Sequence, residues 1–397
     1  MRAIERPTAA PARGPAGPYD VAIVGGGITG CAAAYHLAAA GARVLVLERS
    51  DVGTEASGRN AGSLHGQIQS ASFNQRGTKW AKEFLPALRF LLDALDLWRG
   101  LGDELGQDLE VTTNGGLLLV DSASQLHQVE AKVAIEREAG LDSRVLTRQE
   151  LLELAPYVAA SMIGAGLSPA EGKANPMLAA PAFARNAVLM GAEVMAGTRV
   201  LGIEASTAGA RVVTTAGDFH AEQVILASGN ELAGHAAALG TKLPVTTEPV
   251  QVAATEPVEP LVRHLVYYAG APLTLKQARA GSLLIGGGWP AQLDPVSGYP
   301  TVDISSLRSN LAVALKVAPV IGSALVIRSW AGIGNGTPDE LPLIGRLPGA
   351  GRVLVGLFPY MGLTAGPLMG RVLADLAIGR GPGLDLAPFR LDRFSAA

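Results

Sequence analysis

The sequence predicts an α/β fold in which a parallel, doubly wound unit is joined to a domain with an antiparallel sheet. The first part rests on two apolar runs, at 20–24 and 43–48, which frame a glycine-rich turn and a stretch of small residues. Strands that are buried on both faces of a parallel sheet give such continuous apolar runs. Later strand-like segments such as 273–277 are expected in the second domain.

The N-terminal segment has the pattern of a Rossmann-type dinucleotide site. The turn GGGITG at 25–30 fits GxGxxG, whose glycines allow a tight turn, a close approach to a pyrophosphate and close helix–strand packing. The helix that follows ends at Gly41, and its N-terminus offers N–H groups to phosphates. Glu48 lies 23 residues after Gly25, which suits an acid on the ribose hydroxyls. The expected contacts are Gly25, Gly27, Ile28, Thr29, Gly30, Glu48 and Arg49.

The first unit alone leaves NAD and FAD open, but the segment 49–66 favours FAD. It is a loop of small residues that leads to His65. Small residues let the main chain lie against a flat ring and donate N–H groups to its edge. The alternative is a mobile surface loop, and the lack of acidic residues from Ala56 onward argues against it. The expected flavin contacts are Ser57, Arg59, Asn60, Ala61, Gly62 and Ser63.

With this loop the sequence resembles a known family. The segments GGGITGCAAAYHLAAAGARVLVLER and ASGRNAGS are similar to the FAD-dependent D-amino-acid oxidase family, which includes glycine oxidase and sarcosine oxidase. The similarity covers most of residues 20–380, and ASGRNAGS and LTLKQ…LIGGGWP look most like the flavin subunits of opine oxidases and hydroxyproline dehydrogenases. Further similar segments are 140–158, 164–204, 221–230, 283–290, 330–345 and 356–379.

The resemblance implies a Rossmann-type FAD-binding domain interleaved with an α+β substrate domain on an antiparallel sheet. The FAD-binding domain is expected at 19–80, 160–232 and 328–385, the substrate domain at 81–159 and 233–327, and a flexible tail at 1–18. The patterns also predict a helix at 78–106, strands at 111–120 and 212–215, an extended or edge-strand connection at 244–260, and a buried helix running into a strand at 311–327.

A glycine-rich segment at 356–379 predicts a second contact with the flavin. Pro367 suits the start of a helix over 367–378, and a helix N-terminus stabilises negative charge on the pyrimidine edge of a reduced flavin. The alternative is a glycine-rich lead into a packing helix. The resemblance places Gly362, Leu363 and Thr364 at this edge and Val200 in the adenine-side strand. It adds Gly229, in the turn that ends segment 221–230, to the expected cofactor contacts.

The chain departs from the family at two places. Relatives that tether their flavin use a cysteine near the C-terminal clamp or a histidine near the position of Arg59, whereas the single cysteine here is Cys31. We therefore expect noncovalent FAD. Glycine oxidases often place an arginine after the WAG motif to hold the substrate carboxylate, and Gly334 stands there instead.

Several residues are candidates to replace that arginine. The candidate catalytic or carboxylate-binding residues are His65, Lys276, Arg59 and Arg328. For Lys276 the alternative is a solvated strand-edge lysine, and for Arg328 it is a structural ion pair. Tyr267, Tyr268 and Tyr360 are candidate walls of the pocket, although tyrosines are also common in cores.

The expected reaction removes a hydride from a carbon that bears an amine, passes it to flavin N5 and leaves an imine for hydrolysis. Secondary amines of the opine, proline or sarcosine type are the preferred substrates. The alternatives are a non-catalytic FAD-binding or electron-relay subunit of a larger complex, and a glycine oxidase acting on primary amines. The electron acceptor is oxygen or a downstream carrier, and a partner subunit stays open.

Composition excludes other classes. Among 397 residues, 48% are hydrophobic and 17% charged, which rules out general disorder, and the net charge of −3 argues against a nucleic-acid partner. One cysteine excludes an intrachain disulfide and a cysteine-based metal site, so no metal is expected. The first 18 residues lack the apolar core of a secretory signal, and no clean membrane span is present. We expect a cytoplasmic enzyme.

Overall fold

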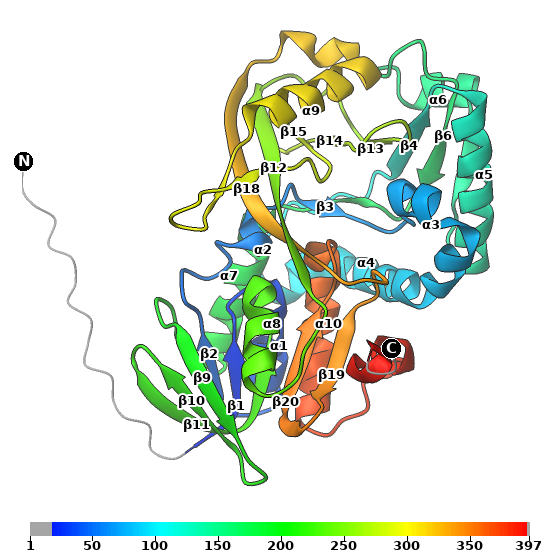
Figure 1. Cartoon of the computed structure of the whole chain (residues 1–397). Coiled ribbons are helices and arrows are strands. Elements are labelled where there is room, and N and C mark those ends of the chain that lie inside the picture. Colours follow the sequence, from blue (N-terminus) through cyan, green and yellow to red (C-terminus); the bar gives the residue numbers. More distant parts are fainter. Residues whose placement is uncertain (1–17, 395–397) are drawn as a thin grey trace, which may run out of the picture.

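A computed structural model describes residues 18–394, whose strands form two eight-stranded sheets and two short two-stranded ones (Figure 1). The predicted α/β fold is confirmed. The expected tail, apart from Pro18, lies outside the described residues. No described helix combines the length and the apolar character that a membrane crossing requires.

The first large sheet contains the dinucleotide pattern. Its order is β19-β20-β11-β1-β2-β8, with β10 and β9 attached to β11 as an antiparallel extension. β1 pairs in parallel with β2 and β11, and β11 with β20. The strands are β1 (Tyr19–Val24), β2 (Val44–Leu47), β8 (Glu193–Met195), β9 (Val200–Ala205), β10 (Ala210–Thr214), β11 (Gly217–Leu226), β19 (Leu343–Leu347) and β20 (Ala350–Leu357).

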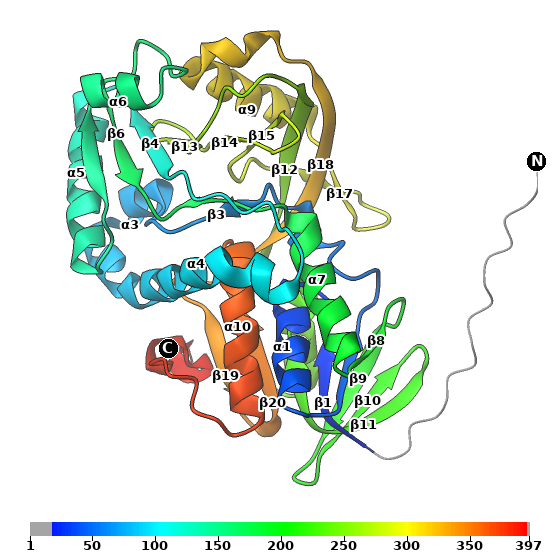
Figure 2. The same ribbon diagram turned by 180° about the vertical axis from the view of Figure 1, so that it is seen from behind.

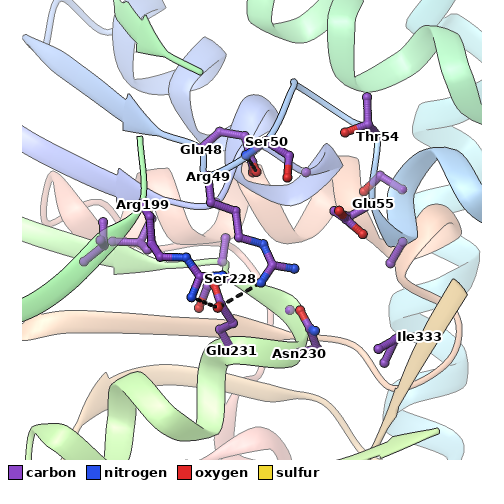
Figure 3. A pocket seen from close by; sticks show the side chains of 18 of the residues that line it. Glu48, Arg49, Ser50, Thr54, Glu55, Arg199, Ser228, Asn230, Glu231 and Ile333 are labelled. Atoms are coloured by element: carbon purple, nitrogen blue, oxygen red, sulfur yellow. Dashed lines mark hydrogen bonds and ion pairs between the residues drawn. The ribbon is translucent and has the colours of Figure 1, made fainter. Parts of the chain in front are cut away.

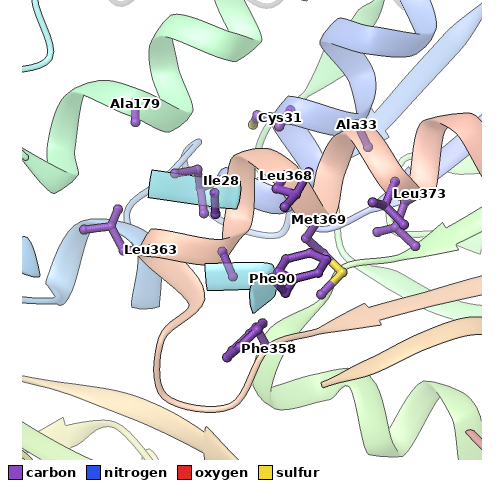
Figure 4. Close-up of a cluster of buried hydrophobic side chains, with 14 of the residues drawn as sticks. Ile28, Cys31, Ala33, Phe90, Ala179, Phe358, Leu363, Leu368, Met369 and Leu373 are labelled. Atoms are coloured by element: carbon purple, nitrogen blue, oxygen red, sulfur yellow. The ribbon is translucent and has the colours of Figure 1, made fainter. Parts of the chain in front are cut away.

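This sheet is buried on both faces, as its continuous apolar runs predict. Val21 and Ile23 of β1 face the layer of α1 (Ile28–Ala39), α7 (Pro176–Leu189) and α10 (Gly362–Ala377), which lie side by side in Figure 2. Ala22 and Val24 face the side where α8 (Leu232–Ala238) packs. Figure 4 draws part of the buried cluster around α1 and α10, to which Phe90 of α4 and Ala179 of α7 also belong.

The second large sheet has the order β18-β12-β15-β14-β13-β4-β6-β5 and is antiparallel except for the pair β13–β4. Its strands are β4 (Gly116–Val120), β5 (Arg144–Thr147), β6 (Gly164–Ser168), β12 (Thr246–Pro257), β13 (Leu265–Tyr268), β14 (Thr274–Gln277), β15 (Ser282–Gly286) and β18 (Val326–Gly336). The helices around it are α3 (Ser70–Glu83), α5 (Ala123–Glu138), α6 (Arg148–Leu154) and α9 (Ile304–Val317). α4 (Leu85–Leu105) packs instead on α10 of the first unit.

Short elements join the two sheets. The loop after β2 contains α2 (Ala56–Arg59) and β3 (Ser63–Leu64), and β3 pairs with β7 (Gly172–Lys173). A hairpin of β16 (Gln292–Leu293) and β17 (Pro300–Thr301) follows β15. Loop 49–66 is therefore not structureless, because one helical turn and one strand hold it in place.

Several expected elements have different bounds. The helix expected at 78–106 is divided at Phe84 between the end of α3 and the start of α4, and α3 begins earlier, at Ser70, with a break at Gly77 (φ 74°). The strand expected at 111–120 begins at Gly116. The helix and strand expected at 311–327 are present as α9 and β18, with a 3₁₀ turn at Pro319–Ser323 between them, but the helix is not buried as expected, because much of it is exposed, including Leu315.

Two proline-containing segments differ in part from expectation. The segment 244–260 is extended, as expected, but it forms β12, which is an inner strand and not an edge strand, because it pairs with β18 on one side and β15 on the other. The last helix begins at Gly362, so Pro367 lies inside α10 and not at its start. In both cases the packing of neighbouring elements outweighs the local preference of proline.

Candidate functional site

A cavity of about 350 Å³ opens at the carboxyl ends of β1 and β2, where doubly wound sheets bind their ligands (Figure 3). Its walls come from the glycine turn, the start of loop 49–66, β9 and the turn after β11. Seven residues expected to bind the cofactor line it: Gly25, Gly27, Glu48, Arg49, Ser57, Val200 and Gly229. The hairpin between β16 and β17 also lines it through residues 297–300, which the sequence did not predict.

The glycine turn has a shape that side chains would prevent. Gly25 has φ 109°, and a Cβ there would lie 2.5 Å from the carbonyl oxygen of Ala227. A Cβ at Gly30 would lie 2.0 Å from the carbonyl oxygen of Gly25. Gly27 caps α1 without a side-chain hydrogen bond, so the helix start keeps donors for an anion, although Ile28 N donates to Ser57 Oγ over 2.9 Å.

Glu48 closes the turn as well as lining the cavity. Its Oε2 accepts from Gly26 N and its Oε1 from Ser50 N, each over 2.7 Å. A carboxylate oxygen has a second lone pair, so both oxygens can still accept from ribose hydroxyls. Opposite Glu48, the guanidinium groups of Arg49 and Arg199 meet Glu231 at 2.8 and 3.1 Å and tie three elements into one wall (Figure 3).

One buried atom on this wall calls for a polar ligand. Asn335 is 9% exposed and lines the cavity, and within the described chain its Oδ1 has no hydrogen-bond partner. A ligand that carries hydroxyl or amide donors would satisfy it. Together with the glycine turn and the uncapped helix, this atom fits a dinucleotide. Asn335 was missed because nothing in its local sequence shows that β18 ends beside β11.

The two segments expected to hold the flavin ring meet each other. His65 N donates to Thr364 Oγ1 over 2.9 Å, and Thr364 Oγ1 donates to the carbonyl of Ser63 over 3.5 Å. Trp98 Nε1 donates to the carbonyl of Thr364 over 2.9 Å and fixes the first turn of α10 from its other side. The start of α10 and loop 49–66 therefore form one surface.

Lys276 reaches the same surface from the second sheet. It is fully buried on β14, an inner strand, and its Nζ donates to Ser63 Oγ over 2.7 Å. The alternative of a solvated strand-edge lysine is therefore wrong. Burial, and after it the charge of Lys173, lowers the pKa of Lys276 to about 7.

His65 connects to a buried carboxylate. Its Nδ1 lies 2.8 Å from the hydroxyl of Tyr267, which donates to Glu171 Oε1 over 3.0 Å. Burial raises the pKa of Glu171 to about 7, whereas burial and the charge of Lys276 lower the pKa of His65 to about 3. Glu171 and the side chains behind it were missed in the sequence. The available signal was a single acid inside the small-residue run GLSPAEGKANP.

Other candidates lie elsewhere or are already engaged. Arg59 donates to the carbonyls of Thr54 and Ala331, pairs with Glu55 at 3.6 Å and stacks on Tyr299. The remaining expected contacts, Asn60, Ala61, Gly62 and Leu363, lie along the loop and the α10 start. Asn60 is held by the carbonyls of the α2 turn.

Two further candidates differ from expectation. Arg328 is exposed and stacks over Trp330, and the described contacts do not include the expected ion pair. Tyr268 donates to Asp121 on the opposite face of β13 from Tyr267, so it does not wall this site. A Cβ at Gly334 would lie 3.7 Å from the ring of Tyr360, which occupies space beside the position of the missing arginine.

A model of the FAD dependent oxidoreductase family matches residues 20–376. The chain belongs to this family. It is therefore an FAD-dependent flavoprotein, as the sequence predicted. A glycine oxidase of Geobacillus kaustophilus is 31% identical, over 94% of this chain and 97% of that protein. The beta subunit of sarcosine oxidase from an Arthrobacter species is 28% identical, over 95% and 91%.

Solved structures agree with this membership. The crystal structure of glycine oxidase from Geobacillus kaustophilus superposes with a TM-score of 0.85 at 29% identity, and covers 95% of this chain and 99% of that one. L-proline dehydrogenase from P. horikoshii gives a TM-score of 0.82 at 25% identity, with 96% and 98% covered.

The flavin has no cysteine to attach to near α10. Cys31 is fully buried in α1, its Sγ donates to the carbonyl of Gly26 over 3.3 Å, and burial raises the pKa of its thiol to about 12. FAD is held noncovalently, consistent with this chemistry. Among residues 18–394, no cluster of His, Cys, Asp or Glu is arranged to hold a metal ion.

Proposed function

We propose that this flavoprotein oxidises the C–N bond of an amino acid, with secondary amines of the sarcosine, proline or opine type as the preferred class. The observation that carries the proposal is the meeting of Lys276, His65 and the α10 start on one surface, with Gly334 in place of an arginine. The names of the relatives support it, since they include glycine oxidase, sarcosine oxidase and 4-methylaminobutanoate oxidase.

FAD supplies the two-electron acceptor when bound. The glycine turn and Glu48 would hold its adenosine diphosphate half in the cavity of Figure 3. The small residues of loop 49–66 and Thr364 would hold the ring, and the positive end of α10 would stabilise negative charge on it. The domain division proposed with it is 19–80, 160–232 and 328–385 for FAD, and 81–159 and 233–327 for substrate. Within this division β6 and most of β18 pair with the second sheet, and α8 packs on the first.

Lys276 would bind the substrate carboxylate. Its Nζ donates to a neutral hydroxyl, and no carboxylate pairs with it in the described chain. An arriving carboxylate would therefore favour the charged ammonium form of the side chain. Arg59 is less suited because its guanidinium group already has two carbonyls, Glu55 and Tyr299 as partners.

The test is anaerobic mixing of the purified holoprotein with glycine, sarcosine, L-proline and octopine. Bleaching of the flavin by the secondary amines, faster than by glycine, supports the proposal. Lys276→Met should raise the KM for sarcosine far more than for an N-methylalkylamine that has no carboxylate. A flavin spectrum indifferent to every amine would overturn the proposal and favour the non-catalytic subunit.

The electron acceptor and any partner form the second part of the proposal. Three relatives are named as beta subunits of sarcosine oxidase, which favours an assembly with a further subunit. Reoxidation in air measures the acceptor: a fast return of the oxidised spectrum identifies oxygen, and a slow return identifies a downstream carrier. Purification of a tagged chain from its native host, followed by mass measurement, tests for the partner.

A further inference from the structure

A chain of buried polar side chains leads from His65 into the second domain. Tyr267 links His65 to Glu171, which is fully buried and also accepts from Gly66 N over 2.7 Å and Gln67 Nε2 over 2.6 Å. The described ion pairs include none between Glu171 and a cation. A buried carboxylate without a paired cation is costly, so its retention calls for a reason.

The neighbouring ion pair orients Gln67 toward Glu171. Lys132 Nζ donates to Gln67 Oε1 over 2.8 Å and pairs with Glu136, and both charged groups are about 1% exposed. Because the amide oxygen of Gln67 faces a cation, its NH₂ group must face Glu171. Lys132 is thus neutralised by Glu136, and Glu171 is held by three neutral donors.

The hydrogen atoms in the hydrogen-bond chain of Glu171, Tyr267 and His65 can be arranged in two ways. Ionised Glu171 can only accept, so Tyr267 donates to it and accepts from Nδ1–H of His65, which leaves a lone pair on Nε2. Protonated Glu171 donates to Tyr267, Tyr267 donates to Nδ1, and Nε2 then carries the hydrogen. A proton taken up at Nε2 therefore ends on Glu171, and no imidazolium ion forms.

We propose that Glu171 accepts the proton of the substrate ammonium through Tyr267 and His65. The inference rests on the proposed function, because an ammonium nitrogen must regain its lone pair before its C–N bond can be oxidised. The ammonium N–H bond breaks and its electron pair stays on nitrogen. A new Nε2–H bond forms, Nδ1–H passes to the phenol oxygen, and the phenol hydrogen passes to Glu171. A cation and a carboxylate thereby become a neutral amine and a carboxylic acid.

The titration of the groups involved is consistent with this transfer. A pKa of about 7 lets Glu171 change its protonation near neutrality, while a pKa of about 3 keeps His65 neutral in both arrangements. The pKa of Tyr267 is raised well above 10 by burial and by Glu171, so the phenol stays protonated. The charged groups that act on this chain are Lys132 and Glu136 of α5 and Lys276 of β14, and Lys173 of β7 acts in turn on Lys276.

The experiment compares Tyr267→Phe and Glu171→Gln with the wild-type holoenzyme, using sarcosine and L-proline as substrates. The rate of anaerobic flavin reduction is measured from pH 6 to 10. The wild-type rate should rise through about pH 7 and level off. Both variants should be slowed about 100-fold at pH 7, and their rise should move to the pH at which the substrate amine itself ionises. Tyr267→Phe tests the connection between His65 and Glu171 even if Glu171→Gln fails to fold.

Tyr268→Phe is the matched control, because that hydroxyl donates to Asp121 on the opposite face of the same strand. It should keep the wild-type profile. A second readout needs no turnover: the infrared carbonyl band of a protonated carboxyl should grow as the pH falls through about 7, and Glu171→Gln should lack it.

The outcomes are distinguishable. If neither amine reduces the wild-type flavin at any pH, the proposed function fails and the relay fails with it. If the amines reduce the wild-type flavin normally and the rate for Tyr267→Phe still rises through about pH 7, the relay alone is overturned. Absence of the infrared band from the wild type would also overturn the relay.

Discussion

Glu48 combines two tasks in one side chain, and its removal should separate them. Glu48→Ala loses the bonds from Gly26 and Ser50 and the expected ribose contacts. Two hydrogen bonds to a charged group, at about 1.5–3 kcal/mol each, predict a Kd for FAD raised by at least about 100-fold. Quenching of flavin fluorescence on titration measures it. Thr198→Ala is the control: Thr198 lines the same cavity, but its hydroxyl donates to the carbonyl of Ala196, so the Kd should change little. Unchanged retention of FAD by Glu48→Ala would contradict the ribose contact.

Residues that act through local geometry were predictable, and those that act through long-range burial were not. Gly25 and Gly30 were found because the turn needs their missing side chains within six residues of sequence. Glu171 lies 105 residues after Gly66 and 96 before Tyr267, and its role depends on all three meeting. Lys276 was named as a candidate, but its burial was not predicted, because that burial depends on β14 being an inner strand.

Buried Lys276 should weaken the protein in a pH-dependent way. Its pKa falls from 10.5 to about 7 in the folded state, so between these values the unfolded chain binds the extra proton. The wild-type protein therefore becomes more stable as the pH rises across that window. The free-energy cost of burying Lys276 is fully present below about pH 7. Lys276→Met should raise the free energy of unfolding by on the order of a few kcal/mol at pH 7 or below. The loss of the hydrogen bond to Ser63 reduces this gain, and the gain should fade toward pH 10.5.

Urea unfolding of the FAD-saturated protein at several pH values measures this difference. Lys79→Met is the control, since Lys79 is 92% exposed and the change should stay within about 0.5 kcal/mol at every pH. A gain for Lys276→Met that does not depend on pH would point to packing and not to charge.

At the scale of elements, α1 and α10 approach so closely that only glycine fits at one crossing. A Cβ at Gly370 would lie 2.5 Å from Ala32 Cβ and 2.6 Å from Ala33 N, and the second atom belongs to the backbone. Gly370→Ala should therefore lower the free energy of unfolding by about 1–3 kcal/mol, the usual cost of overpacking. Thermal or urea unfolding measures it.

The matched control is Gly234→Ala in α8, where an added Cβ would meet no atom within 4 Å. Helix propensity predicts a neutral effect or a gain of up to about 1 kcal/mol there. Equal effects at the two glycines would contradict the close crossing. Sequence showed the small residues of both helices but not that they face each other. It missed the inner position of β12 for the same reason, since the residues of β15 and β18 that pair with β12 are 25 to 90 residues away in the sequence.

At the scale of the whole molecule, the cavity at the ends of β1 and β2 should bind half of the cofactor independently. Its lining includes the glycine turn, Glu48 and Asn335, whose Oδ1 has no partner among residues 18–394, whereas Thr364 and the atoms around it already bond to one another. FAD-free protein should therefore be stabilised by ADP alone and much less by riboflavin. Saturation at 100 times the Kd adds about 2.7 kcal/mol to the free energy of unfolding.

Differential scanning fluorimetry of FAD-free protein, with each ligand titrated separately, measures this order. FAD should raise the Tm most, because it occupies the cavity and the α10 surface together. Glu48→Ala should abolish the ADP effect, while Tyr267→Phe, far from the cavity, should leave it unchanged. Stabilisation by riboflavin without any by ADP would reverse the assignment and place the ring, not the dinucleotide half, in the cavity of Figure 3.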